Sequence, residues 1–290
     1  MTQLILTNRM QKYLTAYMFA NSGIIHAVIP LHISNLTQEG VFYNCKQMES
    51  VTFLNKKMNC EYVGRYFFYG CSKLKELTLP SGMDYPMQGG ECYAQCTSLE
   101  KITFYTNSDY DAYGNCFLGC TNLASIECWY VEEYEYDDDG NAIGYVRVRP
   151  DYIYYCNSNT FTGVGAMKYL LLAHRSETYV YGPTFAGSSI EVIVISSPYV
   201  AIGKAFVGTT ALKEVWINTT DENLLISSDA FTELEVDVNF YFYNYTYEEI
   251  VDIVGNDKWF TNASEKAHFY FKDTIPAGTT IPEDVQNDMK

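Results

Sequence analysis

Hydrophobic positions recur along most of the chain in the spacing L-x-x-L-x-L, preceded by an aromatic residue and a short Gly-Cys turn. The clearest copy, FYGCSKLKELTL, runs from Phe68 to Leu79. Successive aromatic anchors are separated by 23, 26, 25, 24, 44, 24, 21 and 25 residues. The sequence is therefore that of a repeat protein, and the long interval is one period plus about 20 inserted residues. The anchors are Phe19, Phe42, Phe68, Tyr93, Phe117, Phe161, Phe185, Phe206 and Phe231.

The last part of each copy predicts a short strand with two inward apolar side chains. One repeat cannot bury its own core, so the copies must stack, with neighbouring strands about 4.7–4.9 Å apart. Leucine-rich repeats have this period and this L-x-x-L-x-L core. We therefore expect an α/β repeat solenoid over residues 19–243. It should be right-handed and curved, with a ladder of parallel strands on its concave face.

The inserted residues, 129–149, predict a β-hairpin. Two alternating runs flank Asp139-Gly140-Asn141, a sequence typical of tight turns between antiparallel strands. The acidic residues here invite comparison with a calcium loop. Position 12 counted from Glu135 is Val146, where an EF-hand requires a glutamate, so we do not expect calcium binding.

Both ends of the solenoid need a cap, and we assign residues 1–18 and 244–290 to these caps. At the N-terminus, Asn8 is placed to cap a helix. Its apolar face would consist of Met10, Tyr13, Leu14, Tyr17 and Met18.

At the C-terminus, Thr246 and Glu249 form a capping-box pattern that predicts a helix over 247–254, ended by Gly255. The alternation over 268–272 then predicts a strand. The tail from Pro276 is rich in turn residues and acidic.

The outward positions of the strands change character along the chain. In the early repeats they are polar, for example Glu76 and Thr78. Later they become apolar and aromatic, which predicts a patch on the concave face. Monomers seldom leave such a patch exposed without a reason. Its predicted members are Tyr105, Trp129, Tyr169, Leu171, Val192, Val194 and Trp216.

Three interpretations of this patch stay open. The hairpin or the C-terminal segment folds over it, or it is an interface with another macromolecule, or it holds a small ligand. Aromatic anchors suit a protein interface or a surface on which sugar rings stack. We expect a protein partner, with a glycan as the alternative, and self-assembly is a further option.

Composition narrows the class of protein. The 290 residues contain 35 acidic and 19 basic side chains, a net charge of −16, which disfavours binding to nucleic acid. Aromatic residues make up 16% of the chain, which is too many for a disordered protein. The apolar runs are too short to span a bilayer, so we expect no membrane insertion.

The nine cysteines are an odd number, so complete internal pairing is excluded. Four of them lie three residues after an aromatic anchor, at Cys45, Cys71, Cys96 and Cys120. A column of this kind indicates small buried packing positions, and we expect reduced structural thiols.

No catalytic centre emerges from the sequence. The histidines, His26, His32, His174 and His268, are scattered, with no H-E-x-x-H or C-x-x-C spacing. No G-x-S-x-G, P-loop or dinucleotide fingerprint occurs. We expect no enzyme activity, no cofactor and no metal.

More narrowly, the repeat resembles the BspA-like leucine-rich repeats. FYGCSKLKELTLP, CYAQCTSLEKITF and FLGCTNLASIECW match the family pattern A-F-x-G-C-x-x-L-x-x-[VI]-x-[LIF] closely. The resemblance covers residues 19–243. It implies a solenoid used for adhesion and protein–protein contact in bacterial surface proteins and some eukaryotic microbes, without catalytic residues.

We therefore expect a non-catalytic interaction or adhesion module that binds a protein through the concave face. The alternative is a structural or decorating component of a phage virion or another large assembly. The start of the sequence lacks the features of a signal peptide. This favours the assembly role or a cytoplasmic protein, whereas the family resemblance favours the cell surface.

Overall fold

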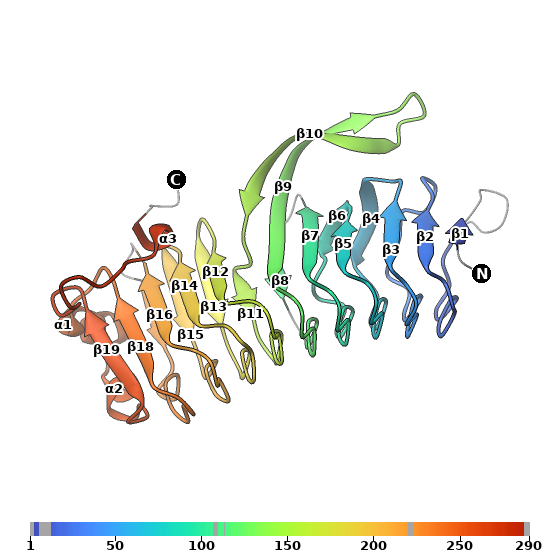
Figure 1. The fold of residues 1–290 in the computed structure, drawn as a ribbon. Coiled ribbons are helices and arrows are strands. Elements are labelled where there is room, and N and C mark those ends of the chain that lie inside the picture. The colour runs from blue at the N-terminus through green and yellow to red at the C-terminus, as the bar shows by residue number, and fades with distance from the viewer. Residues whose placement is uncertain (1–2, 6–12, 107–109, 113, 220–222, 287–290) are drawn as a thin grey trace. The chain divides into compact units, whose positions relative to one another are not determined.

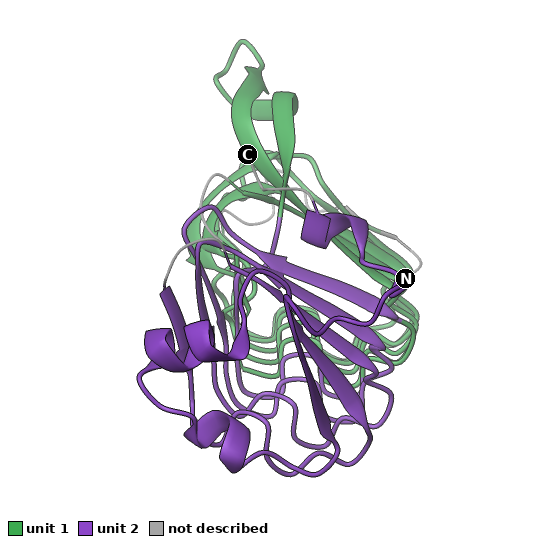
Figure 2. Cartoon of the chain, turned by 90° about the vertical axis from the view of Figure 1, so that its left-hand side faces the viewer, with its two compact units in different colours: residues 1–151, 164–166 green, residues 152–163, 167–290 purple. Residues whose placement is uncertain are grey.

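The computed structural model describes residues 3–5, 13–106, 110–112, 114–219 and 223–286. It divides into two compact units (Figure 2). Unit 1 comprises residues 1–151 and 164–166, and unit 2 comprises residues 152–163 and 167–290. Each unit is a stack of coils in which strands from successive coils lie side by side (Figure 1).

In unit 1, the predicted L-x-x-L-x-L segments form parallel strands. They make two sheets, of order β1-β2-β3 and β10-β9-β7-β5, in which only the β9–β10 pair is antiparallel. A second position in the coil carries the parallel pair β4-β6. The bounds are β1 Gln3–Ile5, β2 His26–Ile29, β3 Ser50–Phe53, β4 Lys57–Tyr62, β5 Glu76–Leu79, β6 Ser81–Tyr85, β7 Lys101–Thr106, β8 Asp111–Ala112, β9 Ser125–Tyr136 and β10 Ala142–Asp151.

Unit 2 contains two parallel ladders, of order β12-β14-β16-β18-β19 and β11-β13-β15-β17. Three short helices follow or flank the last coils. The bounds are β11 Tyr155–Cys156, β12 Tyr169–Ala173, β13 Glu177–Val180, β14 Val192–Ser196, β15 Tyr199–Ile202, β16 Glu214–Asn218, β17 Asn223–Ile226, β18 Val238–Phe242, α1 Tyr247–Val254, α2 Lys258–Thr261, β19 Ala267–Phe271 and α3 Glu283–Gln286.

The aromatic anchors found in the sequence form a continuous column of rings inside each unit. In unit 1 the rings of Phe19, Phe42, Phe68, Tyr93 and Phe117 stack in this order, with centroids 5.4–6.4 Å apart. In unit 2 the same stacking joins Phe161, Phe185, Phe206 and Phe231 at 5.8–6.2 Å. The anchors after Phe19 are fully buried, so the predicted repeat is confirmed as the core of both units.

The cysteine column has a second role besides packing. The thiol of Cys71 donates a hydrogen bond to the backbone oxygen of Phe42, the anchor of the preceding coil, at 3.2 Å. Cys96 donates to Phe68 and Cys120 to Tyr93 in the same way, at 3.1 and 3.2 Å. Each thiol therefore links its own coil to the preceding one, and at Phe42 and Phe68 it adds a second donor to a carbonyl that also accepts from the amide of Cys45 or Cys71.

The turn after each anchor explains the glycine of the repeat. The second residue after the anchor has a positive φ throughout, as at Gly70 (70°) and Gly119 (72°). Glycine adopts this conformation without steric cost. Asn21 and Asn44 occupy the same position in the first two coils, and asparagine tolerates it better than most residues.

The fold differs from the expected α/β solenoid in having little helix. Within the described residues, helix is confined to α1, α2 and α3, and the coils carry a second strand where an α/β repeat would carry a helix. Alternating buried residues produce this second strand, for example Thr178 and Val180 in β13 and Leu224 and Ile226 in β17. The molecule is thus a β-solenoid of about nine turns.

The hairpin and the C-terminal helix lie where the sequence places them. β9 and β10 pair antiparallel around Gly140, whose φ is 81°. α1 has the predicted bounds, and its capping box is formed. The Thr246 hydroxyl accepts from the Glu249 amide and the Glu249 carboxylate accepts from the Thr246 amide.

The predicted N-terminal helix is wrong over its described part. Residues 13–21 form bends and turns, and the preceding strand β1 pairs in parallel with β2. The expected cap Asn8 and the face residue Met10 lie outside the described residues. The spacing of Tyr13, Leu14 and Tyr17 imitates a helical face because these residues belong to a first, shortened coil, in which the Tyr17 amide bonds to Glu39 of the next coil.

Replacing Cys96 with tyrosine tests the column. The thiol is buried between coils, so the larger ring should overpack the core and lower the free energy of unfolding by about 1–3 kcal/mol. Urea denaturation followed by circular dichroism measures this loss. Cys96→Ser keeps the size and the donor and should cost less, whereas a neutral Cys96→Tyr would show that the column is misplaced.

Candidate functional site

The outward side chains of the five-stranded ladder in unit 2 form one apolar row. Strand pairing puts five residues in direct register across β12, β14, β16, β18 and β19. We call this row, together with the adjacent Val192, the ladder face. The row consists of Leu171, Val194, Trp216, Tyr241 and Tyr270.

Aromatic stacking runs along one half of the ladder face. The rings of Trp216 and Tyr241 are 4.1 Å apart and nearly parallel, and those of Tyr241 and Tyr270 are 5.0 Å apart. The indole nitrogen of Trp216 donates to Glu214 at 2.9 Å, so its one polar atom is satisfied beside the row. Such pairs add about 0.5–1.5 kcal/mol beyond the burial of their area.

A neighbouring row on the same surface changes from apolar to polar. Tyr169 and Val192 continue in register to Glu214, Asn239 and His268. The ladder face is therefore bordered by hydrogen-bonding groups along the β16–β19 half and by apolar side chains along the β12–β14 half.

The C-terminal segment, residues 272–286, lies over the ladder face. Val285 is buried in the same cluster as Val194, Trp216 and Tyr241, and Ile275 and Ile281 pack against that cluster. The helix α3 lies against β14 and β16, as Figure 1 shows. The chain thus covers its own aromatic row with a peptide.

Two polar contacts join this segment to the ladder. The Tyr169 hydroxyl donates to the Asp284 carboxylate at 2.6 Å, and the Asn218 amide donates to the backbone oxygen of Val285 at 3.0 Å. Burial, together with the hydrogen bond to Asp284, raises the pKa of Tyr169, so the phenol stays protonated as the donor.

In unit 1, the hairpin formed by β9 and β10 covers Tyr105 of β7. The Tyr145 ring of β10 stacks on Tyr105 of β7 at 4.4 Å. The Tyr145 hydroxyl donates to the Lys56 carbonyl and accepts from the Ser81 amide, at 2.9 and 3.1 Å. Burial raises the pKa of Tyr145, which keeps this hydroxyl protonated.

The structure brings most of the predicted patch residues together in two groups. Leu171, Val192, Val194 and Trp216 belong to one cluster in unit 2, with Tyr169 at its margin and 40% exposed. In unit 1, Tyr105 and Trp129 are neighbours on β7 and β9.

The expected exposure of the patch needs correction. Val194 and Trp216 are fully buried because the C-terminal segment covers them, which is one of the interpretations left open by the sequence. Tyr241, Tyr270 and the covering residues were not among the residues predicted from the sequence. The motifs NFYF of β18 and HFYF of β19 carry the signal, since both place a tyrosine at the same register position.

Tyrosines also gather on the outward side of the second ladder in unit 2. Tyr179 lies between Tyr155 and Tyr199, with ring centroids 5.7 and 5.6 Å away. The ring planes are inclined to one another by 45° and 51°. These rings share no common plane on which sugar rings could stack, which makes the ladder face the better candidate.

The repeat that builds both ladders matches a known family. The BspA-type leucine-rich repeat region, in six copies, matches residues 12–135 and 147–252. The chain belongs to the BspA-type leucine-rich repeat family. Its coils, anchors and Gly-Cys turns are those of this repeat, and the family is typically non-catalytic.

Two solved structures are similar to this BspA-type chain. A leucine-rich cell surface protein of Faecalibacterium prausnitzii is 15% identical, with 97% of this chain and 92% of that chain covered and a TM-score of 0.28. A leucine-rich repeat protein of Bacteroides ovatus is 14% identical, with coverages of 93% and 92% and a TM-score of 0.29. No curated protein matches the sequence. The family assignment rests on the repeat itself.

The described part of this BspA-type chain contains no group of three or more histidine, cysteine or acidic residues able to hold a metal ion. Among the same residues, no helix is long and apolar enough to cross a membrane. In the hairpin turn, hydrogen bonds from the side-chain amide of Asn141, and then from the backbone amides of Asn141 and Asp139, lower the pKa of Asp137 and commit its carboxylate to the turn.

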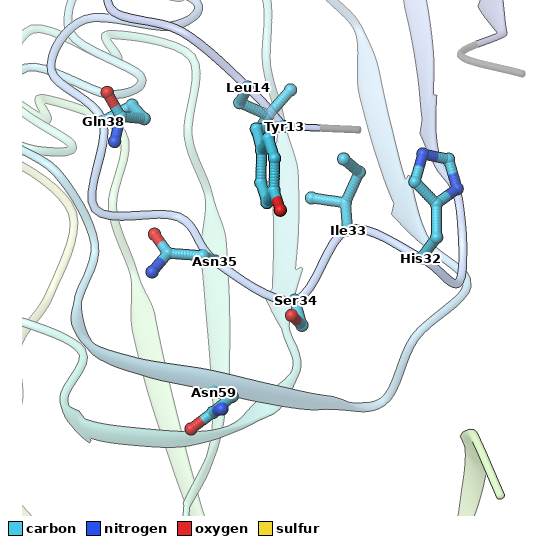
Figure 3. A pocket seen from close by; sticks show the side chains of 8 residues that line it. All are labelled: Tyr13, Leu14, His32, Ile33, Ser34, Asn35, Gln38 and Asn59. Carbon is cyan, nitrogen blue, oxygen red and sulfur yellow. The ribbon is translucent and has the colours of Figure 1, made fainter. Parts of the chain in front are cut away.

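A pocket of about 340 Å³ lies among the described residues of unit 1 of this BspA-type chain (Figure 3). Its eight lining residues are mostly polar and include Tyr13, His32 and Asn59. Tyr13 directly follows residues 6–12, which lie outside the described chain. The lining offers neither a charged cluster nor an aromatic pair, so we assign it no ligand.

Cysteine reactivity in this BspA-type chain should be low in the native state and complete after unfolding. All nine cysteines are free, and eight are buried. Burial raises the pKa of Cys92 to about 12, so its reactive thiolate is scarce at pH 8. Labelling with a maleimide should be slow in buffer and should reach nine thiols in urea without reductant. Fewer than nine would contradict the reduced-thiol interpretation.

The raised pKa of Cys92 also makes the free energy of unfolding depend on pH. The thiol of Cys92 loses its proton near pH 8.5 in the unfolded chain and near 12 in the native chain. Stability is therefore full below about pH 8.5 and falls as the pH rises towards 12, because the unfolded state deprotonates first.

Removing the Tyr145 hydroxyl tests how firmly the hairpin is held. Tyr145→Phe keeps the stacked ring but leaves the Ser81 amide and the Lys56 carbonyl without this partner. We expect a loss of about 1–2 kcal/mol in the free energy of unfolding. Amide hydrogen exchange over residues 130–149 should also become faster. Tyr136→Phe is the matched control, since Tyr136 is 50% exposed, and equal exchange in both variants would contradict the assignment.

Proposed function

We propose that this chain is a non-catalytic binding module that holds a short peptide segment of a partner protein on the ladder face of unit 2. One observation carries the proposal: five outward side chains in register are apolar, and a peptide segment lies on them. Outward strand positions that serve only to face water are polar, as Thr52 and Thr78 are in unit 1.

The chemistry of the ladder face fits a peptide better than a glycan or a small ligand. The face is a flat row of apolar and aromatic side chains bordered by donors from Tyr169 and Asn218. Aromatic side chains packed among aliphatic ones dominate the energetics of protein interfaces. The donors at its margin suit a backbone carbonyl and a carboxylate, which a protein segment supplies.

The margin beside β12 is the accessible part of this surface. Tyr169 is 40% exposed, and Leu171 and Val192 are half-buried. A partner can therefore make its first contacts there. Adhesion is the setting that membership of the family implies for such binding, and we propose it as the biological context.

A selection experiment tests the proposal without knowledge of the natural partner. A phage-displayed library of random 12-residue peptides is panned on the full-length chain. The selected peptides should lose at least ten-fold in affinity when Leu171→Glu and Val192→Glu are combined, because the two charges lie at the accessible margin of the ladder face.

The matched control is Thr52→Glu with Thr78→Glu, which adds the same charge at exposed outward positions of unit 1. Circular dichroism should show equal folding of both variants. The proposal is wrong if the panning yields no binders, or if the selected peptides bind both variants as tightly as the original chain.

A further inference from the structure

The C-terminal segment is attached to the rest of unit 2 in a different way from every ladder strand. A ladder strand such as β16 is bonded through its backbone to β14 on one side and β18 on the other. Among the described residues after Lys272, the backbone hydrogen bonds stay within the segment or return to Phe271, at its root. Examples are Ile275 to Phe271 and Val285 to Pro282.

Contact with the ladder is made by side chains and by one carbonyl. Val285 is buried in one cluster with Val194, Trp216 and Tyr241 of the row, and Ile275 and Ile281 pack against this cluster. The two hydrogen bonds involve Asp284 and the carbonyl of Val285. The segment can therefore leave the ladder without breaking any backbone pairing between strands.

The segment is a short chain of turns with one helical turn, and its sequence restricts its conformation. Pro276 and Pro282 restrict the backbone, and Gly278 has a φ of 88°. Its only helix, α3, has four residues. A short, proline-restricted chain loses little conformational entropy when it binds, and the same holds for a free peptide of this sequence.

We propose that residues 273–286 are an exchangeable occupant of the ladder face. The inference rests on the function proposed above and names its ligand class. The partner segment is a short peptide of turns and irregular structure with apolar side chains in the places of Ile275, Ile281 and Val285. A carboxylate takes the place of Asp284. The covering segment is then a built-in competitor, and binding in trans requires its displacement.

Competition from a tethered segment lowers the apparent affinity of any partner. The free chain is binding-competent only in the fraction of molecules whose segment has left the face, and the apparent dissociation constant rises in inverse proportion to that fraction. Substitutions that weaken the segment should therefore tighten binding in trans, although they lie outside the binding surface.

The experiment uses the full-length chain and a fluorescein-labelled peptide of residues 273–286, DTIPAGTTIPEDVQ. In the release variant, Ile281→Asp and Val285→Asp place charges where the segment meets the apolar row. Fluorescence polarisation should show the peptide binding the release variant at least ten-fold more tightly than the unchanged chain. Val285→Ala alone should shift the affinity in the same direction by a smaller factor.

The control variant carries Ala277→Asp and Thr280→Asp, the same charge change at exposed positions of the same segment. It should behave like the unchanged chain. A peptide that itself carries Ile281→Asp and Val285→Asp should bind none of the proteins. Equal peptide affinity for the release and control variants would overturn the inference.

A second measurement reports displacement directly. Trp216 is fully buried beneath the segment, so the release variant should show red-shifted tryptophan emission and stronger quenching by acrylamide. Trp216→Phe in the same background assigns the signal. An unchanged spectrum with a folded protein would mean that the segment stays in place, which also overturns the inference.

The peptides selected by panning separate this inference from the proposed function. If their binding depends on Leu171 and Val192 but they bind the release variant no better than the unchanged chain, the proposed peptide binding is supported and the proposed competition by residues 273–286 is wrong. If no selected peptide depends on these residues, the function itself fails. A concentration-dependent dimer with exchanged segments would make a second copy, rather than another protein, the occupant.

Discussion

A single coil of this chain cannot enclose a core, and the whole structure depends on how the next coil completes it. In both units, the backbone amide of an anchor donates to a carbonyl one coil further on, as Phe42 does to Phe67 at 2.9 Å and Phe161 to Thr184 at 3.0 Å. The ring of the anchor stacks on the ring of that next coil. The two interactions fix the same register, so the side chains inside must recur at the same place in every coil.

The need for matching coils restricts the identity of the side chains that point into the core, but not of those that point outward from the strands. The residue two after the anchor needs a positive φ, and the cysteine must reach the carbonyl of the preceding anchor, so both recur. Outward strand residues meet only their neighbours on the ladder. They run from Glu76 and Thr78 in unit 1 to Trp216 and Tyr241 in unit 2 without disturbing the coil. The outward rows are therefore the part of such a molecule that can change without altering the fold.

Local repetition made most of the fold predictable from the sequence. The anchors, the strands of the main ladder, the hairpin turn at Gly140 and the helix α1 all follow from residues that lie within one period of each other. The second strand of each coil was missed because its short alternations, such as ETYV in β13, are weaker than the anchor motif. The N-terminal helix was wrong because a shortened coil also spaces apolar residues three and four apart.

The covering of the ladder face depends on contacts that no local pattern encodes. Tyr169 and Asp284 are 115 residues apart in sequence, and Asn218 and Val285 are 67 apart. From the sequence, the outward apolar row could be found for β12, β14 and β16, and the tail could be seen to be rich in turn residues. That the tail lies on the row follows only from the folded chain.

The β9–β10 hairpin and the C-terminal segment, which cover the two apolar groups, are attached to their ladders in different ways. The hairpin is continuous with β9, a strand of the ladder, and is fixed by backbone and hydroxyl bonds to Lys56 and Ser81. Displacing the hairpin would break the hydrogen bond from the Lys56 amide to the Ala142 carbonyl and both hydrogen bonds of the Tyr145 hydroxyl, and a buried polar group left without a partner costs about 1–3 kcal/mol.

The C-terminal segment meets its row through apolar side chains and two hydrogen bonds, and its departure leaves the strand pairing intact. A partner peptide with the same apolar side chains, a carboxylate in the place of Asp284 and a carbonyl in the place of Val285 would make the same contacts with the ladder face. The hairpin therefore has the properties of a fixed part of the coil, whereas the C-terminal segment has those of a ligand that the chain carries with it.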